Sequence, residues 1–361
     1  MTFLNQTPDR SFEMAPVFPD NSIPVPDRSA ENPRIITSLG GGHGLFQTLK
    51  AVRSCAPEKI NAVVTVADDG GSSGRIRHEL GQIPPGDLRM ALAALTTDDE
   101  DGHLWELLLQ HRFGGHGALA GHALGNLLIV ALTDMFGTSQ NALDKVAELA
   151  GSRGRVLPVC LEPLDLEAEV SGLDNDPRLM RQVRGQVAVA ATPGQVRRVR
   201  VIPERPQANP DAVQAILDAD LVTLGPGSWF SSVIPHILVP DIVDALERTR
   251  AVKVLVLNLT SEPGETAGFS TERHLHVLRQ HASNLKVDQI IVDSGTVSLH
   301  SEREHLERAA RTLGAEVSFQ DVRAEDGRGR FTSVHDPAKL CDALMLQYRQ
   351  VRSGRWFEQD I

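Results

Sequence analysis

The chain is poor in the residues that several classes of protein require. Its 361 residues include only three cysteines, Cys55, Cys160 and Cys341, which lie far apart and form no CxxC or Cys/His pattern. We therefore expect neither a disulfide framework nor a zinc site. Such sparse use of cysteine fits a reducing cytoplasm.

Positive charge and long apolar runs are also scarce. There are 36 Lys and Arg against 47 Asp and Glu, a formal net charge of −11, which argues against a general nucleic-acid binder. The small basic cluster at residues 197–200 is interpreted as a solvated strand or turn rather than a phosphate contact. No apolar run approaches the roughly 18 residues that span a bilayer, and the N-terminus lacks the pattern of a secretory signal. We expect a cytoplasmic protein with no membrane span.

What the sequence does contain favours one large α/β domain. Residues 1–33 carry six prolines and no sustained apolar periodicity, which predicts a flexible tail. From residue 34 onward, β-branched runs alternate with segments of helical spacing, an order typical of a mainly parallel sheet with crossover helices. The expected strands are Ile35–Leu39, Ile60–Ala67, Leu221–Leu224, Val252–Leu257 and Gln289–Val292. The expected helices are Leu88–Leu95, Leu104–His111, Leu124–Met135, Asn141–Leu149, Asp211–Asp218, Pro240–Thr249, Thr271–His281 and Pro337–Val351.

One stretch interrupts this α/β rhythm. Residues from about 155 to 203 alternate apolar and polar positions without strong helical spacing, which predicts an antiparallel β-hairpin insert. Because the α/β rhythm returns afterwards, we predict a single doubly wound, Rossmann-like domain over residues 34–361 that contains the insert. The last predicted helix could pack on the core or on a second subunit.

Two glycine-rich turns follow predicted strands. The first, IITSLGGGHGL at residues 35–45, resembles a phosphate-binding turn, but Leu45 stands where the GxGxxG fingerprint needs its third glycine. A tight turn that binds no ligand is the alternative. The second, LVTLGPGSWFSS at residues 221–232, predicts another anion cradle. Two cradles at neighbouring strand ends suit a nucleoside diphosphate derivative.

Acidic and amide side chains lie near these turns. In VADDGGSSGRIR, Asp68 and Asp69 follow a strand and could hold a ribose hydroxyl or Mg²⁺, whereas the structural alternative is that one of them caps a turn. Asp87 in PPGDLR is interpreted as a helix cap. Asn126 in GHALGN is expected to reach into the cleft and to find a hydrogen-bond partner if it is buried.

Other catalytic signatures are missing. His111, His116 and His122 lack metal-ligand spacing such as HExxH, so surface or supporting positions are expected for them. The sequence has no P-loop, no GxSxG elbow and no catalytic cysteine context.

Six blocks taken together resemble a known family. Over roughly residues 34 to 330 their order and spacing are similar to those of the YvcK family, also called gluconeogenesis factors, within a superfamily that includes CofD, the 2-phospho-L-lactate transferase. The blocks are GGGHGL, VADDGGSSGRIR, PPGDLRMALAAL, GHALGNLLI, GPGSWFSSVIPHILV and NLTSEPGETAGFS. The resemblance implies a Rossmann-like fold that binds UDP-sugars, notably UDP-N-acetylglucosamine, with NAD as an alternative occupant of the cleft.

The resemblance also implies site residues, carried over motif by motif. The nucleotide site would comprise Gly41, Gly42, His43, Asp68, Asp69, Asn126, Gly227 and Ser228. The sugar site would comprise Thr260, Glu265, Thr266 and Phe269. His43 stands where many relatives have Thr, and Phe269 where relatives often have Tyr. Losing a hydroxyl contact at Phe269 would cost roughly 0.5–1.5 kcal/mol of binding.

Three functions follow as hypotheses. The first is a regulatory protein without turnover that binds UDP-N-acetylglucosamine, requires no cofactor, and links carbon metabolism to cell shape and peptidoglycan synthesis. Its expected partners are cell-wall synthesis or regulatory proteins, and a homo-oligomer is considered. The second is a CofD-like phosphotransferase acting on a nucleotide-diphosphate-linked substrate, with Asp68 and Asp69 as candidate ligands of Mg²⁺. The third, an NAD-dependent dehydrogenase, is weaker because the fingerprint is incomplete.

Overall fold

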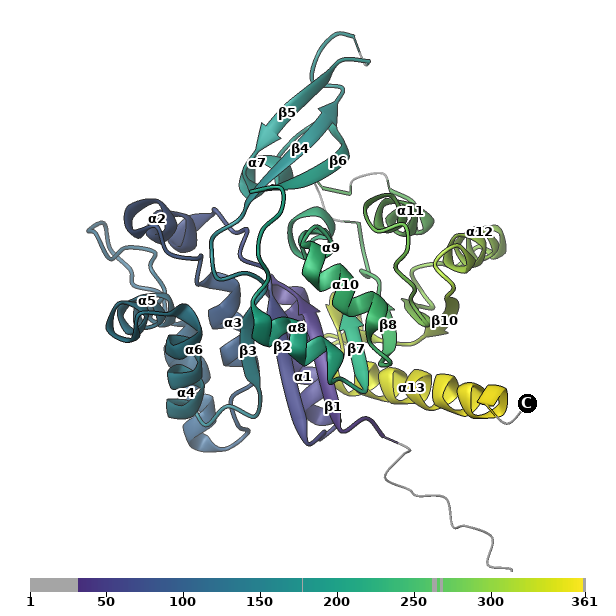
Figure 1. The fold of residues 1–361 in the computed structure, drawn as a ribbon, viewed down its shortest axis with the longest axis horizontal. Coiled ribbons are helices and arrows are strands. Elements are labelled where there is room, and N and C mark those ends of the chain that lie inside the picture. The colour runs from purple at the N-terminus through teal and green to yellow at the C-terminus, as the bar shows by residue number, and fades with distance from the viewer. Residues whose placement is uncertain (1–31, 177, 262–264, 267–268, 360–361) are drawn as a thin grey trace, which may run out of the picture. The chain divides into compact units, whose positions relative to one another are not determined.

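The computed structural model describes residues 32–176, 178–261, 265–266 and 269–359. Apart from its last two residues, the predicted tail at residues 1–33 lies outside this part of the chain. The remainder, from Asn32 onward, forms one compact unit. Within it the described strands pair into a seven-stranded main sheet, a three-stranded insert sheet and a two-stranded ribbon (Figure 1).

The main sheet is parallel throughout and doubly wound. Its neighbouring strands, in order, are β10 (Glu316–Gln320), β9 (Gln289–Asp293), β8 (Val252–Val256), β7 (Leu221–Leu224), β1 (Ile35–Gly40), β2 (Lys59–Val64) and β3 (Arg155–Pro158). The chain starts at β1, builds outward through β2 and β3, and later returns to β7 and builds the other way. The strand order therefore reverses between β1 and β7, where ligands bind in sheets of this kind.

Helices cover the sheet, and α8 and α10 cross in front of the strands in Figure 1. The first half of the chain forms α1 (Gly42–Ser54), α2 (Gly71–Leu80), α3 (Gly86–Ala94), α4 (Glu100–Gln110), α5 (Leu124–Phe136) and α6 (Ser139–Leu149). The second half forms α7 (Gln186–Ala190), α8 (Pro210–Leu217), the π-helical turn η2 (Trp229–Val233), α9 (Ile234–Ile237), α10 (Pro240–Arg248), α11 (Thr271–His281), α12 (His300–Arg311) and α13 (Pro337–Gln359). These elements confirm the predicted α/β alternation.

The central strands carry apolar residues on both faces because helices cover both. In β1, Ile36 and Leu39 are fully buried, and α1 returns Leu45 and Leu49 to the same core. Leu39 of β1 pairs in register with Leu224 of β7. Each of these two strands runs into a glycine-rich turn, so the register brings the two turns to the same edge of the sheet.

The insert differs in extent from the predicted hairpin. Residues 155–158 belong to the main sheet as β3, because they pair with β2. The insert sheet itself is antiparallel, with β4 (Asp165–Ser171) between β5 (Met180–Arg184) and β6 (Gln195–Ile202), and α7 lies in the connection from β5 to β6. Figure 1 shows it standing clear of the main sheet.

The C-terminal helix α13 packs on the core of the same chain, against α1. It follows the ribbon of β11 (Arg323–Glu325) and β12 (Phe331–His335). Of the three leucines on which that prediction rested, Leu340 and Leu344 are buried in this contact, whereas Leu346 is exposed. The sequence left open whether this helix packs on the core or on a second subunit, and the structure shows that it packs on the core.

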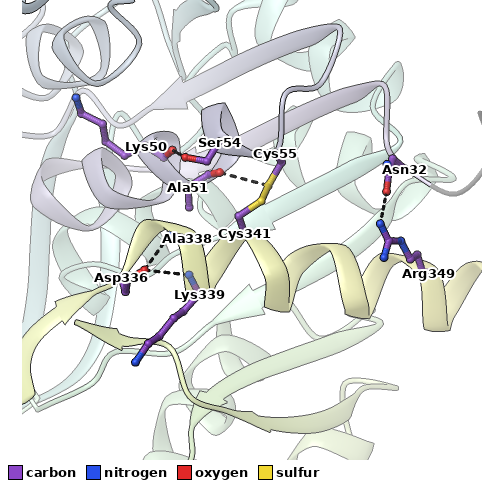
Figure 2. The surroundings of a disulfide bond; sticks show 10 residues. All are labelled: Asn32, Lys50, Ala51, Ser54, Cys55, Asp336, Ala338, Lys339, Cys341 and Arg349. Atoms are coloured by element: carbon purple, nitrogen blue, oxygen red, sulfur yellow. Dashed lines mark hydrogen bonds between the residues drawn. A yellow bond between two sulfur atoms is a disulfide. The ribbon is translucent and has the colours of Figure 1, made fainter. Parts of the chain in front are cut away.

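A disulfide corrects the expectation that cysteines stay unpaired. Cys55, at the C-terminal end of α1, bonds to Cys341 in α13, with their Cα atoms 5.7 Å apart (Figure 2). Cysteine spacing could not predict this disulfide, because the two residues are separated by 286 positions and meet only through the packing of the two helices. Cys160 is free and buried, and burial raises the pKa of its thiol to about 12.

Among the described residues, no single helix is long and apolar enough to cross a membrane. The segment Trp229–Ile237 and the helix Pro240–Arg248 pass the length and composition test only as a pair, and that pair is bent by 71°.

Candidate functional site

The two glycine turns predicted as cradles touch each other, backbone to backbone. A Cβ atom on Gly44 would lie 2.2 Å from the carbonyl oxygen of Pro226 and 2.6 Å from the Cα of Gly227. Only glycine fits there, because such distances are far below van der Waals contact. Gly42 has a φ of +56°, which also favours glycine. Gly41, Gly42 and Gly227 therefore lie together at the point where the strand order reverses.

A side chain from the next strand holds the second turn in place. Asn258, just after β8, accepts a hydrogen bond from Gly227 N at 2.8 Å and donates one from Nδ2 to Gly227 O at 2.9 Å. This paired contact satisfies both polar groups of Gly227 and fixes the loop that Gly44 abuts. The sequence analysis did not single out Asn258, although a polar residue directly after a predicted strand was the available signal.

Beside these turns lies a cavity of about 280 Å³, here called the switch-point pocket. His43, predicted for the nucleotide site, lines it together with Thr260, predicted for the sugar site. The ribbon strand β12 supplies part of the wall, a contribution that the sequence gave no reason to expect. The described lining residues are His43, Gly44, Gln47, Pro226, Gly227, Asn258, Leu259, Thr260, Ser333, Val334 and His335.

Asp87 caps a helix, but not its own. Its carboxylate accepts a hydrogen bond from Gly42 N at the start of α1, whereas the cap of α3 itself makes no side-chain bond. A Cβ on Gly41 would lie 2.5 Å from Asp87 Oδ2. Desolvation by burial, and then the nearby charge of Asp68, raise the pKa of Asp87 to about 7. The predicted capping role of Asp87 is therefore confirmed, and the helix that it caps is α1.

The adjacent carboxylates Asp68 and Asp69 face different parts of the molecule. Asp68 turns inward, accepts a hydrogen bond from Gly70 N at 2.9 Å and bonds to Ser73, and burial raises its pKa. Asp69 instead accepts a hydrogen bond from Val187 N in the insert, also at 2.9 Å. Asp68 therefore holds the acidic loop to the start of α2, whereas Asp69 holds it to the insert.

Asn126 belongs to a buried polar chain, which confirms that it finds partners. Its Oδ1 accepts from Arg89 Nε at 3.0 Å, and its Nδ2 donates to Ser72 Oγ at 2.9 Å. Ser72 Oγ lies 2.9 Å from His122 Nδ1, so His122 has a supporting place, as expected. Burial and the charge of Arg112 lower the pKa of Arg89 to about 10.

The hydrogen-bonded residues Ser72 and Arg89 border a second cavity of about 270 Å³, here called the acidic pocket. Two guanidinium groups and two half-buried carboxylates share it with the N-terminal turn of α2. Arg89 and Arg112 were not predicted as site residues, although Arg89 stands two residues after Asp87 in PPGDLR. The described lining residues are Asp68, Gly70, Gly71, Ser72, Ser73, Gly86, Asp87, Arg89, Met90 and Arg112.

The remaining predicted sugar residues lie behind the second glycine turn. Glu265 is buried and accepts a hydrogen bond from Phe230 N at 3.0 Å, and Thr266 is fully buried. Phe269 meets Phe230 edge to face, with ring centroids 6.0 Å apart. Glu265 and Phe269 border a cavity of about 420 Å³ with residues 191–195 of the insert, so Thr260 and these residues line different cavities.

Ser228 precedes η2 and is half-buried. Its carbonyl oxygen accepts hydrogen bonds from Ser232 N and Val233 N, and its side chain makes no capping bond. His111 and His116 are exposed. Within the described ranges no three His, Cys, Asp or Glu side chains gather as a metal site.

Comparison with known proteins agrees with this architecture. A family model described as 2-phospho-L-lactate transferase CofD matches residues 36–328. A putative gluconeogenesis factor of Mycobacterium leprae is 58% identical over 316 residues, which cover 88% of this chain and 86% of that protein. The gluconeogenesis factor of Listeria monocytogenes is 34% identical over 321 residues, covering 87% of this chain and 95% of the relative.

A solved structure has the same fold. The crystal structure of a UPF0052-family protein from Bacillus halodurans superimposes with a TM-score of 0.75 at 31% sequence identity. The superposition covers 86% of this chain and 98% of that one.

Proposed function

Because the chain belongs to the CofD-like family and to its gluconeogenesis factors, we propose that it is a cytoplasmic regulatory protein that binds UDP-N-acetylglucosamine. In this role it links carbon metabolism to cell shape and peptidoglycan synthesis, through partner proteins of cell-wall synthesis or its regulation. The ligand's diphosphate lies at the glycine turns.

One observation carries the proposal. The turn at Gly44 and the loop at Gly227 meet without any side chain between them, and Asn258 holds that loop from behind. Gly42 and Gly44 of the first turn are half-buried at the start of α1, and glycine backbone at a helix N-terminus is the arrangement that accepts a diphosphate. His43 and Thr260 at the same pocket supply polar groups for the rest of the ligand.

The lining of the switch-point pocket supports binding without turnover. Its described polar side chains are imidazole, amide and hydroxyl groups, and none of them is a carboxylate. Such groups recognise a ligand by hydrogen bonds, and they include no carboxylate to hold Mg²⁺ for a phosphoryl transfer.

The acidic pocket favours a second function, a CofD-like Mg²⁺-dependent phosphotransferase. Asp68 and Asp87 are the carboxylates that fit Mg²⁺ there, and Asp69 takes part only if it leaves Val187. A bound Mg²⁺ would neutralise charge on a transferred phosphoryl group. Arg89 and Arg112 would hold the phosphate oxygens.

The experiment is calorimetric titration of the full chain with UDP-N-acetylglucosamine, then NAD and a GDP-linked ligand, each with and without Mg²⁺. We expect saturable binding of the UDP-sugar. Asn258→Ala should weaken that binding by about tenfold, since it frees the Gly227 loop, whereas Asn141→Ala on the exposed side of α6 should leave it unchanged.

Product analysis under the same conditions separates the two functions. Binding without product supports the regulator. Turnover that Asp68→Asn abolishes while affinity is kept would replace it with the transferase. Binding of NAD alone would contradict both.

A further inference from the structure

Helix α4 has one face built for the core of its own chain. Gly102 and Leu109 are buried on that face, and Trp105 is half-buried against the core. Glu106 on the same side accepts a hydrogen bond from Lys50 at 2.8 Å. The spacing of these residues, i, i+3, i+4 and i+7, is that of one helical stripe, so the helix needs no further apolar contact to be held in place.

The opposite face of α4 is apolar as well, and it faces solvent. Leu104, Leu107 and Leu108 are 52%, 56% and 37% exposed. Glu100 and His111, both exposed, flank them at the two ends. Counted from Glu100, these positions fall at i, i+4, i+7, i+8 and i+11, which is the spacing of one helical face. Along this outward face an acidic residue is followed by three leucines and then by a histidine. We call it the leucine face.

Further exposed apolar residues lie in the helical hairpin that α4 forms with the following loop and α5. Single exposed leucines are ordinary, but a cluster on one surface marks a contact with another molecule. The further large exposed hydrophobic residues of the hairpin are Leu119, Met135 and Phe136.

We propose that the leucine face pairs with the leucine face of a second copy of this chain, antiparallel, about a twofold axis. The order of its residues is the argument. The midpoint between Glu100 and His111 falls inside the leucine cluster, so an antiparallel pair places each Glu100 opposite the partner copy's His111 and each Leu104 opposite a Leu107. A twofold interface needs such self-complementarity.

A parallel pair lacks this match, because it sets Glu100 against Glu100 and aligns the two helix dipoles unfavourably. An unrelated partner would not require the acid and the histidine to be spaced symmetrically about the leucines. The second copy is therefore the occupant that the pattern favours, and this inference does not depend on the ligand proposed above.

Sedimentation velocity of the full chain across a wide concentration range tests the pairing. We expect a concentration-dependent shift from the mass of one chain, 39.2 kDa, to twice that mass. Leu107→Glu should raise the dimer dissociation constant by about tenfold or more, since it buries a charge between the helices. Leu149→Glu, at a leucine that is 49% exposed on α6, is the matched control and should leave the dissociation constant unchanged.

Charge exchange and cross-linking test the orientation. Glu100→Lys should weaken the dimer, and adding His111→Glu should restore it. Across the 11 residues between positions 100 and 111 a helix rises about 16 Å, too far for a disulfide within one copy. Glu100→Cys combined with His111→Cys should therefore form cross-linked dimers on oxidation, whereas neither single variant should.

A single-chain mass at every concentration, with circular dichroism that shows a folded chain, would overturn the proposal and leave the face to a different partner. A dimer that Leu107→Glu does not weaken would overturn it too. Cross-linking by Glu100→Cys alone would show a parallel pair and contradict the orientation.

Discussion

The carboxylate of Asp69 accepts a hydrogen bond from the backbone N–H of Val187 at 2.9 Å, although 118 residues separate them in sequence. A Cβ on Gly185 would lie 2.2 Å from Asp69 Oδ2, so the insert approaches the acidic loop as closely as a glycine allows. Arg77 adds a second connection through Asp165 at the base of β4. The loop that begins beside the acidic pocket is therefore also the anchor of the insert.

Removing this anchor should loosen the insert locally. In Asp69→Ala, we expect the amides of α7, Val187 included, to exchange hydrogen faster, because the bond at Val187 is lost. The free energy of unfolding should fall by only about 0.5–1.5 kcal/mol, the usual net worth of one hydrogen bond. Hydrogen exchange with mass spectrometry measures the first effect and urea denaturation the second.

Asp176→Ala is the control, since Asp176 is an exposed acid in the β4–β5 turn whose partners are local. Unchanged exchange in α7 of Asp69→Ala would contradict the anchoring role.

Glycine at position 44 is expected to be indispensable. Alanine there would place Cβ on the Pro226–Gly227 backbone, so Gly44→Ala should cost about 1–3 kcal/mol of stability or more, since backbone cannot move aside as a side chain does. Gly114→Ala has nothing within 4 Å of the added atom and is the matched control. Thermal unfolding of both variants decides the matter, and equal melting temperatures would refute the close contact.

Asp87 gives the stability of the fold a particular dependence on pH. Its pKa is about 7 in the folded chain and 3.8 in an ordinary carboxyl group, so the folded state holds the proton more tightly. Stability linked to Asp87 is then highest below pH 4 and is lost as pH rises from about 4 to 7. Three pKa units correspond to a change on the order of 4 kcal/mol.

Asp87→Asn isolates this contribution, because asparagine is neutral at all pH values and can still accept the Gly42 N–H. We expect the variant to gain stability over the natural protein at pH 8 and to gain much less at pH 5. Chemical denaturation at the two pH values measures the difference. A stability difference between the variant and the natural protein that is the same at pH 8 and at pH 5 would contradict the raised pKa of Asp87.

The sequence was informative wherever local pattern and position along a strand decide the structure. It located the central strands, the glycine turns and the buried role of Asn126, because apolar periodicity and a break into glycines are local signals. It missed Asn258, whose role depends on β8 being the neighbour of β7. The sequence also did not predict that β12 lines the switch-point pocket, since no local pattern in a C-terminal ribbon indicates that it lies near His43.

Two other differences have the same origin. The sequence predicted that Asp87 caps a helix but not which one, because only the fold brings the start of α1 to its carboxylate. Arg155 was read with the insert because short alternating strands look alike in sequence, and only pairing with β2 assigns Arg155–Pro158 to the main sheet.

The disulfide between Cys55 and Cys341 should stabilise the fold by joining α13 to α1 (Figure 2). It closes a loop of nearly the whole domain, and cross-links of long loops restrict the unfolded chain most, so reduction should cost about 2–5 kcal/mol of stability. The buried Cys160 thiol should not take part, since its pKa lies far above neutral pH. Denaturation with and without a reductant should therefore differ for the natural protein and for Cys160→Ala, and should coincide for Cys55→Ser combined with Cys341→Ser. A reductant effect that survives in the double variant would show that the lost stability comes from elsewhere, and no effect in the natural protein would show that the bond does not restrain α13.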